Sequence, residues 1–80
     1  MRLDKFLKVS RLIKRRTVAK DLADNERVLV NGRVAKPATE VTPGDIITVR
    51  LGGKNLVVEV LELKDSVRAS DAGRLYRVIT

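Results

Sequence analysis

The spacing of apolar residues changes once along this chain, near Arg27, and that change constrains the fold more than any other feature. Before it, Leu3, Phe6 and Leu7 recur at helical spacing and predict a helix near Leu3–Val9. A second apolar face predicts a helix near Arg15–Asp24, with Val18, Ala19, Leu22 and Ala23 turned inward. Phe6 is expected in the core.

After Arg27 the residues have strand character and are separated by turn signals. Asn31-Gly32 lies between two β-branched runs, and both of its residues tolerate positive φ, so it predicts a hairpin. Pro43-Gly44-Asp45 and Gly52-Gly53 predict two further turns. The strands are expected at Val28–Val30, Arg33–Ala35, Ile46–Leu51, Leu56–Leu63 and Tyr76–Thr80. Between the last two, Ala69–Leu75 is a possible helical turn that Gly73 disfavours.

These elements predict an α+β fold in a single domain, residues 1–80. Two N-terminal helices pack on a small twisted antiparallel sheet of four to five strands. Their apolar faces cover the sheet, and their basic faces are expected to point outward together.

Several chemistries are excluded by composition. The chain has no cysteine and no histidine, which removes disulfides, thiolate or imidazole metal sites and Ser-His nucleophiles. Its acidic residues share no catalytic motif, so we expect neither an enzyme nor a cofactor. Apolar runs of at most three residues, such as Leu56-Val57-Val58, exclude a membrane span. The absence of cysteine fits a cytoplasmic protein.

The net charge of +7 is confined to one quarter of the chain. Residues 1–20 hold eight basic residues and one acid, Asp4, whereas residues 21–80 hold nine of each sign. A basic end on a neutral body is typical of a polyanion-binding face, although solvated charge is the alternative. The planar guanidinium group of arginine can bind phosphate through two hydrogen bonds, so the arginines are expected to make the strongest contacts. The predicted RNA-binding residues are Arg2, Arg16, Arg11, Arg15, Lys5, Lys8, Lys14 and Lys20.

Two further expectations concern this basic region. Asp4 is expected to pair with Lys8 at i, i+4. The only aromatic residues are Phe6 and Tyr76, which argues against base stacking on an aromatic platform. Recognition of folded RNA by shape and phosphate positions is expected instead.

An ordered set of residues resembles the S-four RNA-binding domain, also called the alpha-L motif. The matching positions are Arg2-Leu3-Asp4-Lys5-Phe6-Leu7, Arg15-Arg16-Thr17, Ala19, Leu22, Val28, Val30-Asn31-Gly32, Lys36, Val41 and Gly44-Asp45. The motif core covers about residues 2–50, and residues 51–80 add strands and a short C-terminal tail. The resemblance implies the fold predicted above and binding to structured RNA.

Within that family, the chain is most similar to the stand-alone RqcP family of bacterial ribosome-associated quality control. The similarity lies in Met1–Lys20, Pro43-Gly44-Asp45, Glu62–Asp65 and the small size. It implies binding to large ribosomal subunits obstructed by peptidyl-tRNA, alongside an RqcH-like tailing factor. Contacts to ribosomal RNA and peptidyl-site tRNA would hold the tRNA while alanine is added to the stalled chain. The resemblance places Arg2 and Arg16 first, and it assigns nothing to residues 66–80.

Other interpretations stay open. A related stand-alone factor could recycle ribosomal subunits released by heat shock or assist ribosome assembly. The chain could also be the RNA-targeting subunit of an RNA-modification enzyme whose catalytic domain lies elsewhere. Binding to an anionic membrane is disfavoured, because the first helix has little apolar face. A monomer is expected.

Overall fold

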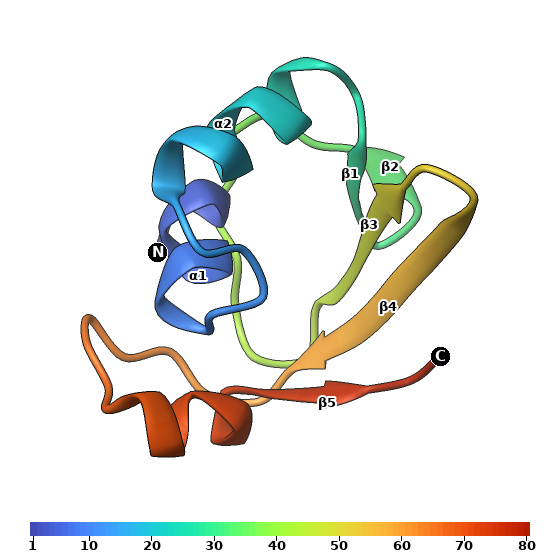
Figure 1. Cartoon of the computed structure of the whole chain (residues 1–80). Helices are drawn as coiled ribbons and strands as arrows, with labels where there is room; N and C mark the ends of the chain where they lie inside the picture. The colour runs from blue at the N-terminus through green and yellow to red at the C-terminus, as the bar shows by residue number, and fades with distance from the viewer.

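A computed structural model describes residues 1–80 and shows two helices followed by a five-stranded sheet (Figure 1). The helices are α1, Leu3–Val9, and α2, Arg16–Asp24. The strands are β1, Val28–Val30, β2, Arg33–Val34, β3, Ile46–Leu51, β4, Lys54–Val60, and β5, Tyr76–Val78. A 3-10 helix, η1, Ala69–Arg74, precedes β5. The strand order is β2-β1-β3-β4-β5 and every pairing is antiparallel, which confirms the predicted α+β fold.

The turn residues set the register of the sheet. Val30 pairs with Arg33 across Asn31-Gly32, whose φ values are 52° and 80°, as a two-residue hairpin turn requires. The Asn31 side chain also reaches β3, where its Oδ1 accepts the Ile46 N–H at 2.9 Å. This turn therefore fixes β1 against both of its neighbours.

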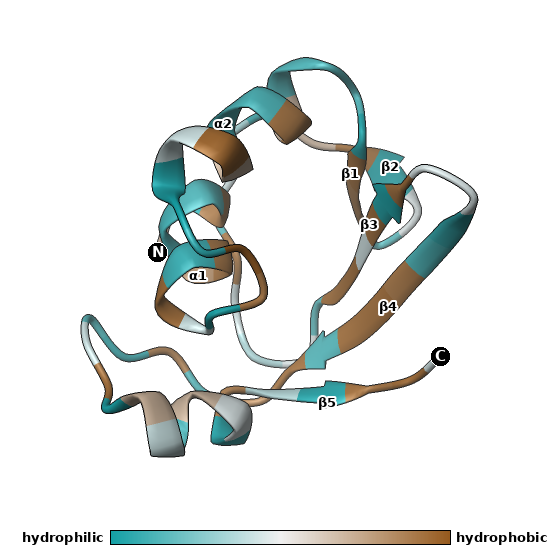
Figure 2. Ribbon diagram, in the orientation of Figure 1, coloured by the Kyte–Doolittle hydropathy of each residue, from teal (hydrophilic) through white to brown (hydrophobic).

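One apolar core lies between the helices and one face of the sheet. Its fully buried residues from α1 are Leu3, Phe6 and Leu7, and those from β3 and β4 are Ile47, Val49, Val58 and Val60. The alternation along β3 and β4 is the period-two pattern of a sheet with one covered face. Burying each such side chain contributes about 1.5–3 kcal/mol. In Figure 2 the middle of β4 is hydrophobic, whereas its first residues and the first residues of α2 are hydrophilic.

The structure corrects several predicted bounds. Arg15 is the N-cap of α2 rather than its first helical residue. β4 begins at Lys54, because the Gly52-Gly53 turn allows Leu51 to pair with Lys54 directly, and it ends at Val60. β2 and β5 are shorter than predicted.

The prediction that Val18 is buried is wrong, since it is 44% exposed. The small residues Ala19 and Ala23 occupy the buried stripe of α2 instead. None of the helices has the length and apolar character needed to cross a membrane.

Candidate nucleic-acid interface

The start of α1 is held in place by the segment that follows β2. The Leu3 N–H donates to the carbonyl of Thr39 at 2.8 Å, and the Asp4 N–H donates to that of Pro37 at 3.1 Å. Amide groups in the first turn of a helix have no partner within the helix, so these bonds satisfy them from outside. Arg2 forms an isolated β-bridge with Glu40. The backbone of Arg2 is thus fixed directly before the helix.

Asp4 binds both Arg2 and Arg16, the two arginines expected to make the main RNA contacts. Its Oδ1 accepts from Arg2 Nε at 3.2 Å and from Arg16 Nη2 at 3.3 Å, and its Oδ2 accepts from Arg2 Nη2 at 3.2 Å. The Lys5 backbone N–H also donates to Oδ1 at 2.8 Å. The Asp4 side chain is 4% exposed, whereas those of Arg2 and Arg16 are 48% and 46% exposed. One buried carboxylate therefore holds two half-exposed guanidinium groups.

The charge of Asp4 is maintained by these partners. Burial raises the pKa of the Asp4 carboxyl, but hydrogen bonds from Arg16 and Arg2 and the Arg16 charge outweigh burial, so the pKa lies below its ordinary value of 3.8. Two cations on one anion leave the group with a charge of +1. Each guanidinium has five N–H donors, so most of them remain free to bind an anion. The arrangement is suited to binding phosphate.

We use the name helical basic surface for the eight predicted residues, of which Asp4 brings together Arg2 and Arg16: Arg2, Lys5, Lys8, Arg11, Lys14, Arg15, Arg16 and Lys20. All are exposed except Lys5, which is intermediate. Lys5 Nζ donates to Asp65 at 2.9 Å and so links α1 to the C-terminal segment. Five residues of the surface form no ion pair: Lys8, Arg11, Lys14, Arg15 and Lys20.

Arg11 has a left-handed backbone conformation with φ of 62°. It follows Ser10, the C-cap of α1, and its N–H donates to the carbonyl of Lys8 at 3.0 Å. Glycine usually occupies this position, because a side chain there costs about 1–2 kcal/mol. An exposed arginine in a conformation that favours glycine is consistent with a role outside the fold.

The sequence did not predict the role of Asp4. Its expected partner, Lys8, forms no ion pair, and Arg16 from the second helix takes its place. The i, i+4 rule considers one helix only, whereas tertiary packing brings Arg16 to Asp4. The available signal was that Asp4 is the one acid among eight basic residues in the first twenty.

Comparison with known proteins is consistent with this surface. The S4 domain family model matches residues 1–47, which include both helices and the Asn31-Gly32 hairpin. The RQC P-site tRNA stabilizing factor of Bacillus subtilis is 54% identical over 79 residues, covering 99% of this chain and 92% of that protein. Its counterpart in Streptococcus pneumoniae is 54% identical over 80 residues, covering 100% of this chain and 91% of that protein.

Two solved structures share the fold. Heat Shock Protein 15 of Vibrio cholerae, solved as a trimer, has a TM-score of 0.90 at 35% identity, covering 98% of this chain and 80% of that one. The solution structure of HP1423 has a TM-score of 0.85 at 32% identity, covering 100% of this chain and 98% of that one. With a matching family model and relatives that align over nearly its whole length, this chain belongs to the S4 domain family, among the RQC P-site tRNA stabilizing factors.

Proposed function

We propose that this protein is a cytoplasmic, non-enzymatic RNA-binding factor of ribosome-associated quality control that stabilises tRNA in the P site. The observation that carries the proposal is the Asp4 cluster, in which Arg2 and Arg16 are held side by side with most of their donors free. The assignment of tRNA in the P site as the ligand is taken from the names of the relatives. The particle it binds is a large ribosomal subunit obstructed by peptidyl-tRNA.

The mechanism is positional. The helical basic surface lies between ribosomal RNA and tRNA, two polyanions that repel each other, and the net charge of +7 on residues 1–20 offsets that repulsion. Tighter binding to subunits that hold tRNA in the P site would by reciprocity stabilise the tRNA there. An RqcH-like factor on the same particle then adds alanine residues to the stalled chain. The protein acts as a monomer.

A direct test compares purified large subunits that carry peptidyl-tRNA with vacant large subunits. Wild-type protein should bind the tRNA-bearing particles more tightly, and Arg16→Ala should weaken that binding at least about tenfold. Arg50→Ala is the matched control, because Arg50 is exposed and forms no ion pair. If about five phosphates are neutralised, log affinity should fall with log salt at a slope of roughly −4. Equal affinity for both particles would contradict the P-site assignment.

The similarity to Heat Shock Protein 15 favours a second candidate, a stand-alone ribosome-binding factor that recycles subunits released by heat shock or assists ribosome assembly and takes no part in alanine tailing. An experiment in cells that lack the protein distinguishes the two candidates. If the proposed function holds, these cells should lose alanine-tailed stalled chains, and the chains should return with the wild-type gene but not with Arg16→Ala. Unchanged tailing together with retained subunit binding would favour the second candidate.

A further inference from the structure

The segment between β4 and β5 is anchored to the body of the protein. Ala72 and Leu75 are buried, and Val67 packs against the core. The N–H groups of Leu61 and Glu62 both donate to the carbonyl of Leu75, at 2.8 and 3.3 Å. The segment is therefore packed against the fold, and it lies beyond the residues that match the S4 domain.

Three basic residues of this segment have no ion-pair partner or only a distant one. Lys64, Arg68 and Arg74 line a surface hollow of about 340 Å³, together with Glu62, Ser66, Val67, Asp71 and Leu75. Lys64 and Arg68 form no ion pair. Arg74 meets Asp71 only at 3.9 Å and is 80% exposed. We call Lys64, Arg68 and Arg74 the C-terminal basic surface.

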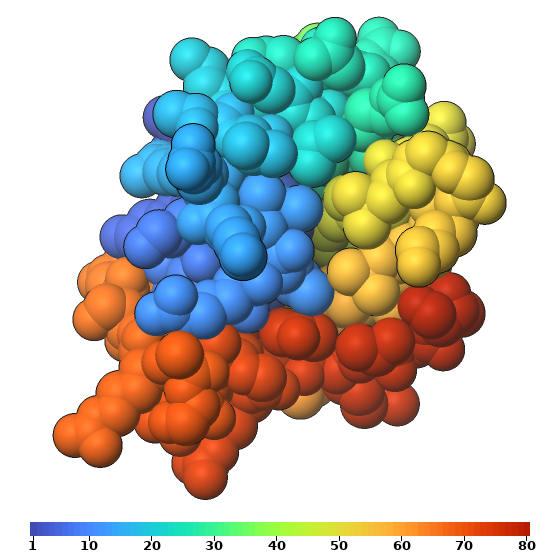
Figure 3. All heavy atoms as spheres, viewed as in Figure 1, coloured from blue at the N-terminus to red at the C-terminus, as the bar shows by residue number.

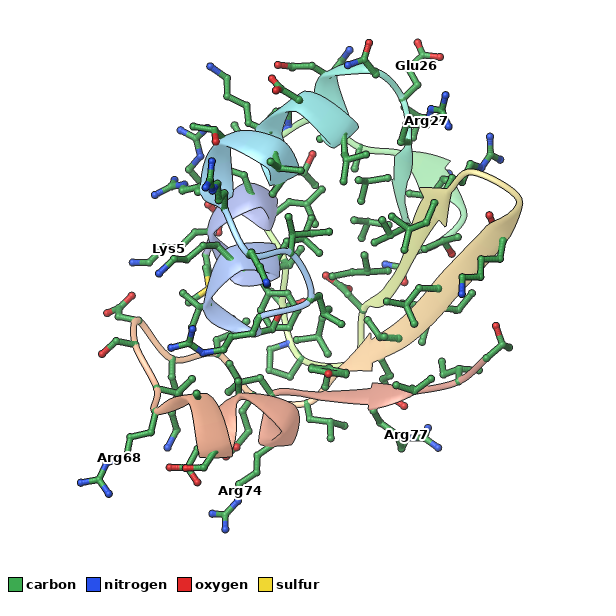
Figure 4. All side chains as sticks on the ribbon, in the orientation of Figure 1. Lys5, Glu26, Arg27, Arg68, Arg74 and Arg77 are labelled. Atoms are coloured by element: carbon green, nitrogen blue, oxygen red, sulfur yellow. The ribbon has the colours of Figure 1, made fainter.

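This surface lies next to the helical basic surface. The Lys5–Asp65 ion pair joins α1 to the residue that follows Lys64. A smaller crevice between them is lined by Lys8, Val9, Arg11, Asp65, Ser66 and Val67. Figure 3 shows the C-terminal segment, in orange, directly below the blue N-terminal region on the same face. In Figure 4, Arg68 and Arg74 extend outward from the segment that contains η1, and Lys5 lies above them on α1.

The summed charge of residues 21–80 gives no indication of this surface. Residues 21–80 are neutral in sum, but two of their acids pair with cations outside this surface. Asp65 pairs with Lys5, and Glu59 pairs with Arg77. Lys64 and Arg68 therefore form no ion pair beside a surface that is already basic, and the three cations of the hollow exceed its two acids, Glu62 and Asp71.

We propose that the C-terminal basic surface is a second RNA contact, which binds phosphates of an RNA segment adjoining the one bound by the helical basic surface. The inference rests on the proposed function and extends it to residues outside the family motif. Unpaired guanidinium forks match phosphate geometry. The hollow has only Val67 and Leu75 as apolar lining, and Leu75 is buried, so it lacks the exposed anchor of a protein interface.

The first test is charge reversal with a matched control. Arg68→Glu/Arg74→Glu should weaken binding to large subunits carrying P-site tRNA at least about tenfold and make the salt slope shallower by roughly 2. Arg50→Glu/Lys54→Glu has the same net charge change, and both residues are exposed and form no ion pair. We expect it to bind within about threefold of wild type, because only general attraction is reduced. Thermal melting of both variants verifies the fold.

The outcomes separate this inference from the proposed function. If Arg16→Ala weakens binding but Arg68→Glu/Arg74→Glu performs like the control pair, the second contact is refuted and the proposed function stands. If wild-type protein does not distinguish tRNA-bearing from vacant subunits, the proposed function itself fails.

A second measurement uses the absence of cysteine, because an introduced cysteine is then the only thiol in the protein. Hydroxyl radicals generated at Ser66→Cys should cleave RNA of the bound particle, and those from Thr17→Cys on α2 should cleave a nearby segment. Lys54→Cys, in the β3–β4 hairpin, is the control and should give little cleavage. Cleavage from Thr17→Cys without cleavage from Ser66→Cys would overturn the inference.

Discussion

The carboxylate of Asp4 accepts a hydrogen bond of 3.3 Å from Arg16, twelve residues further along the chain and on the other helix. Arg2 shares the same carboxylate. A free arginine side chain carries about 2 kcal/mol of rotamer entropy, which binding to phosphate would otherwise have to overcome. Holding both guanidinium groups in the folded protein reduces that cost before RNA arrives.

Asp4→Asn separates positioning from simple charge. The substitution raises the net charge from +7 to +8, so general electrostatics alone would strengthen RNA binding. We expect weaker binding, by about threefold to tenfold, because both arginines lose the charged partner that orients them. The buried hydrogen bonds also weaken, which should lower the free energy of unfolding by about 1–2 kcal/mol. Affinity for tRNA-bearing subunits and chemical denaturation measure the two effects, and tighter binding by Asp4→Asn would refute the positioning role.

Because of the same carboxylate, the free energy of unfolding depends on pH in the acidic range. The pKa of Asp4 is below 3.8 in the folded protein, so its contribution to stability is complete above the unfolded-state pKa. That contribution is lost as pH falls through the folded-state pKa. The informative quantity is the difference in the free energy of unfolding between wild type and Asp4→Asn, because contributions common to both proteins cancel. Denaturation at about pH 6 and about pH 2.5 should show this difference shrinking on the acid side, and a constant difference would contradict the prediction.

The local parts of the fold were predictable from the sequence. The bounds of α1 and β3 agree with prediction because apolar spacing and the flanking turn residues determine them, and Asn31-Gly32 forms the expected hairpin. The tertiary parts were not. No spacing rule within one helix could bring Arg16 to Asp4, and the exposure of Val18 follows from the way α2 packs.

Arg16→Lys tests whether the shape of the cation matters. Net charge is conserved, but an ammonium group lacks the planar fork that can contact Asp4 and a phosphate at once. We expect affinity for tRNA-bearing subunits to fall about threefold to tenfold while the salt slope stays nearly constant, since the number of cations is unchanged. Arg50→Lys is the control. Equal affinities of Arg16→Lys and wild type would mean that Arg16 acts only as a point charge.

The two helix ends allow a comparison of stability with function. Arg11 and Glu26 both have φ of 62°, and each follows a helix C-cap. At Glu26 the N–H groups of Glu26 and Arg27 donate to Ala23 and Leu22, the bonding pattern that usually ends in glycine. Glu26→Gly and Arg11→Gly should each stabilise the fold by about 0.5–1 kcal/mol, because glycine adopts this conformation without strain.

Their effects on RNA binding should differ. Arg11→Gly removes a cation of the helical basic surface, so affinity for tRNA-bearing subunits should fall a few-fold and the salt slope should become shallower by roughly 1. Glu26→Gly removes no cation and should bind at least as tightly as wild type. A stabilisation of 1 kcal/mol raises Tm by about 4–8 °C in a domain of this size, so melting curves resolve both variants. If Arg11→Gly gained stability without losing affinity, Arg11 would be a helix terminus that glycine could replace, and the cost of its backbone conformation would have no function in RNA binding.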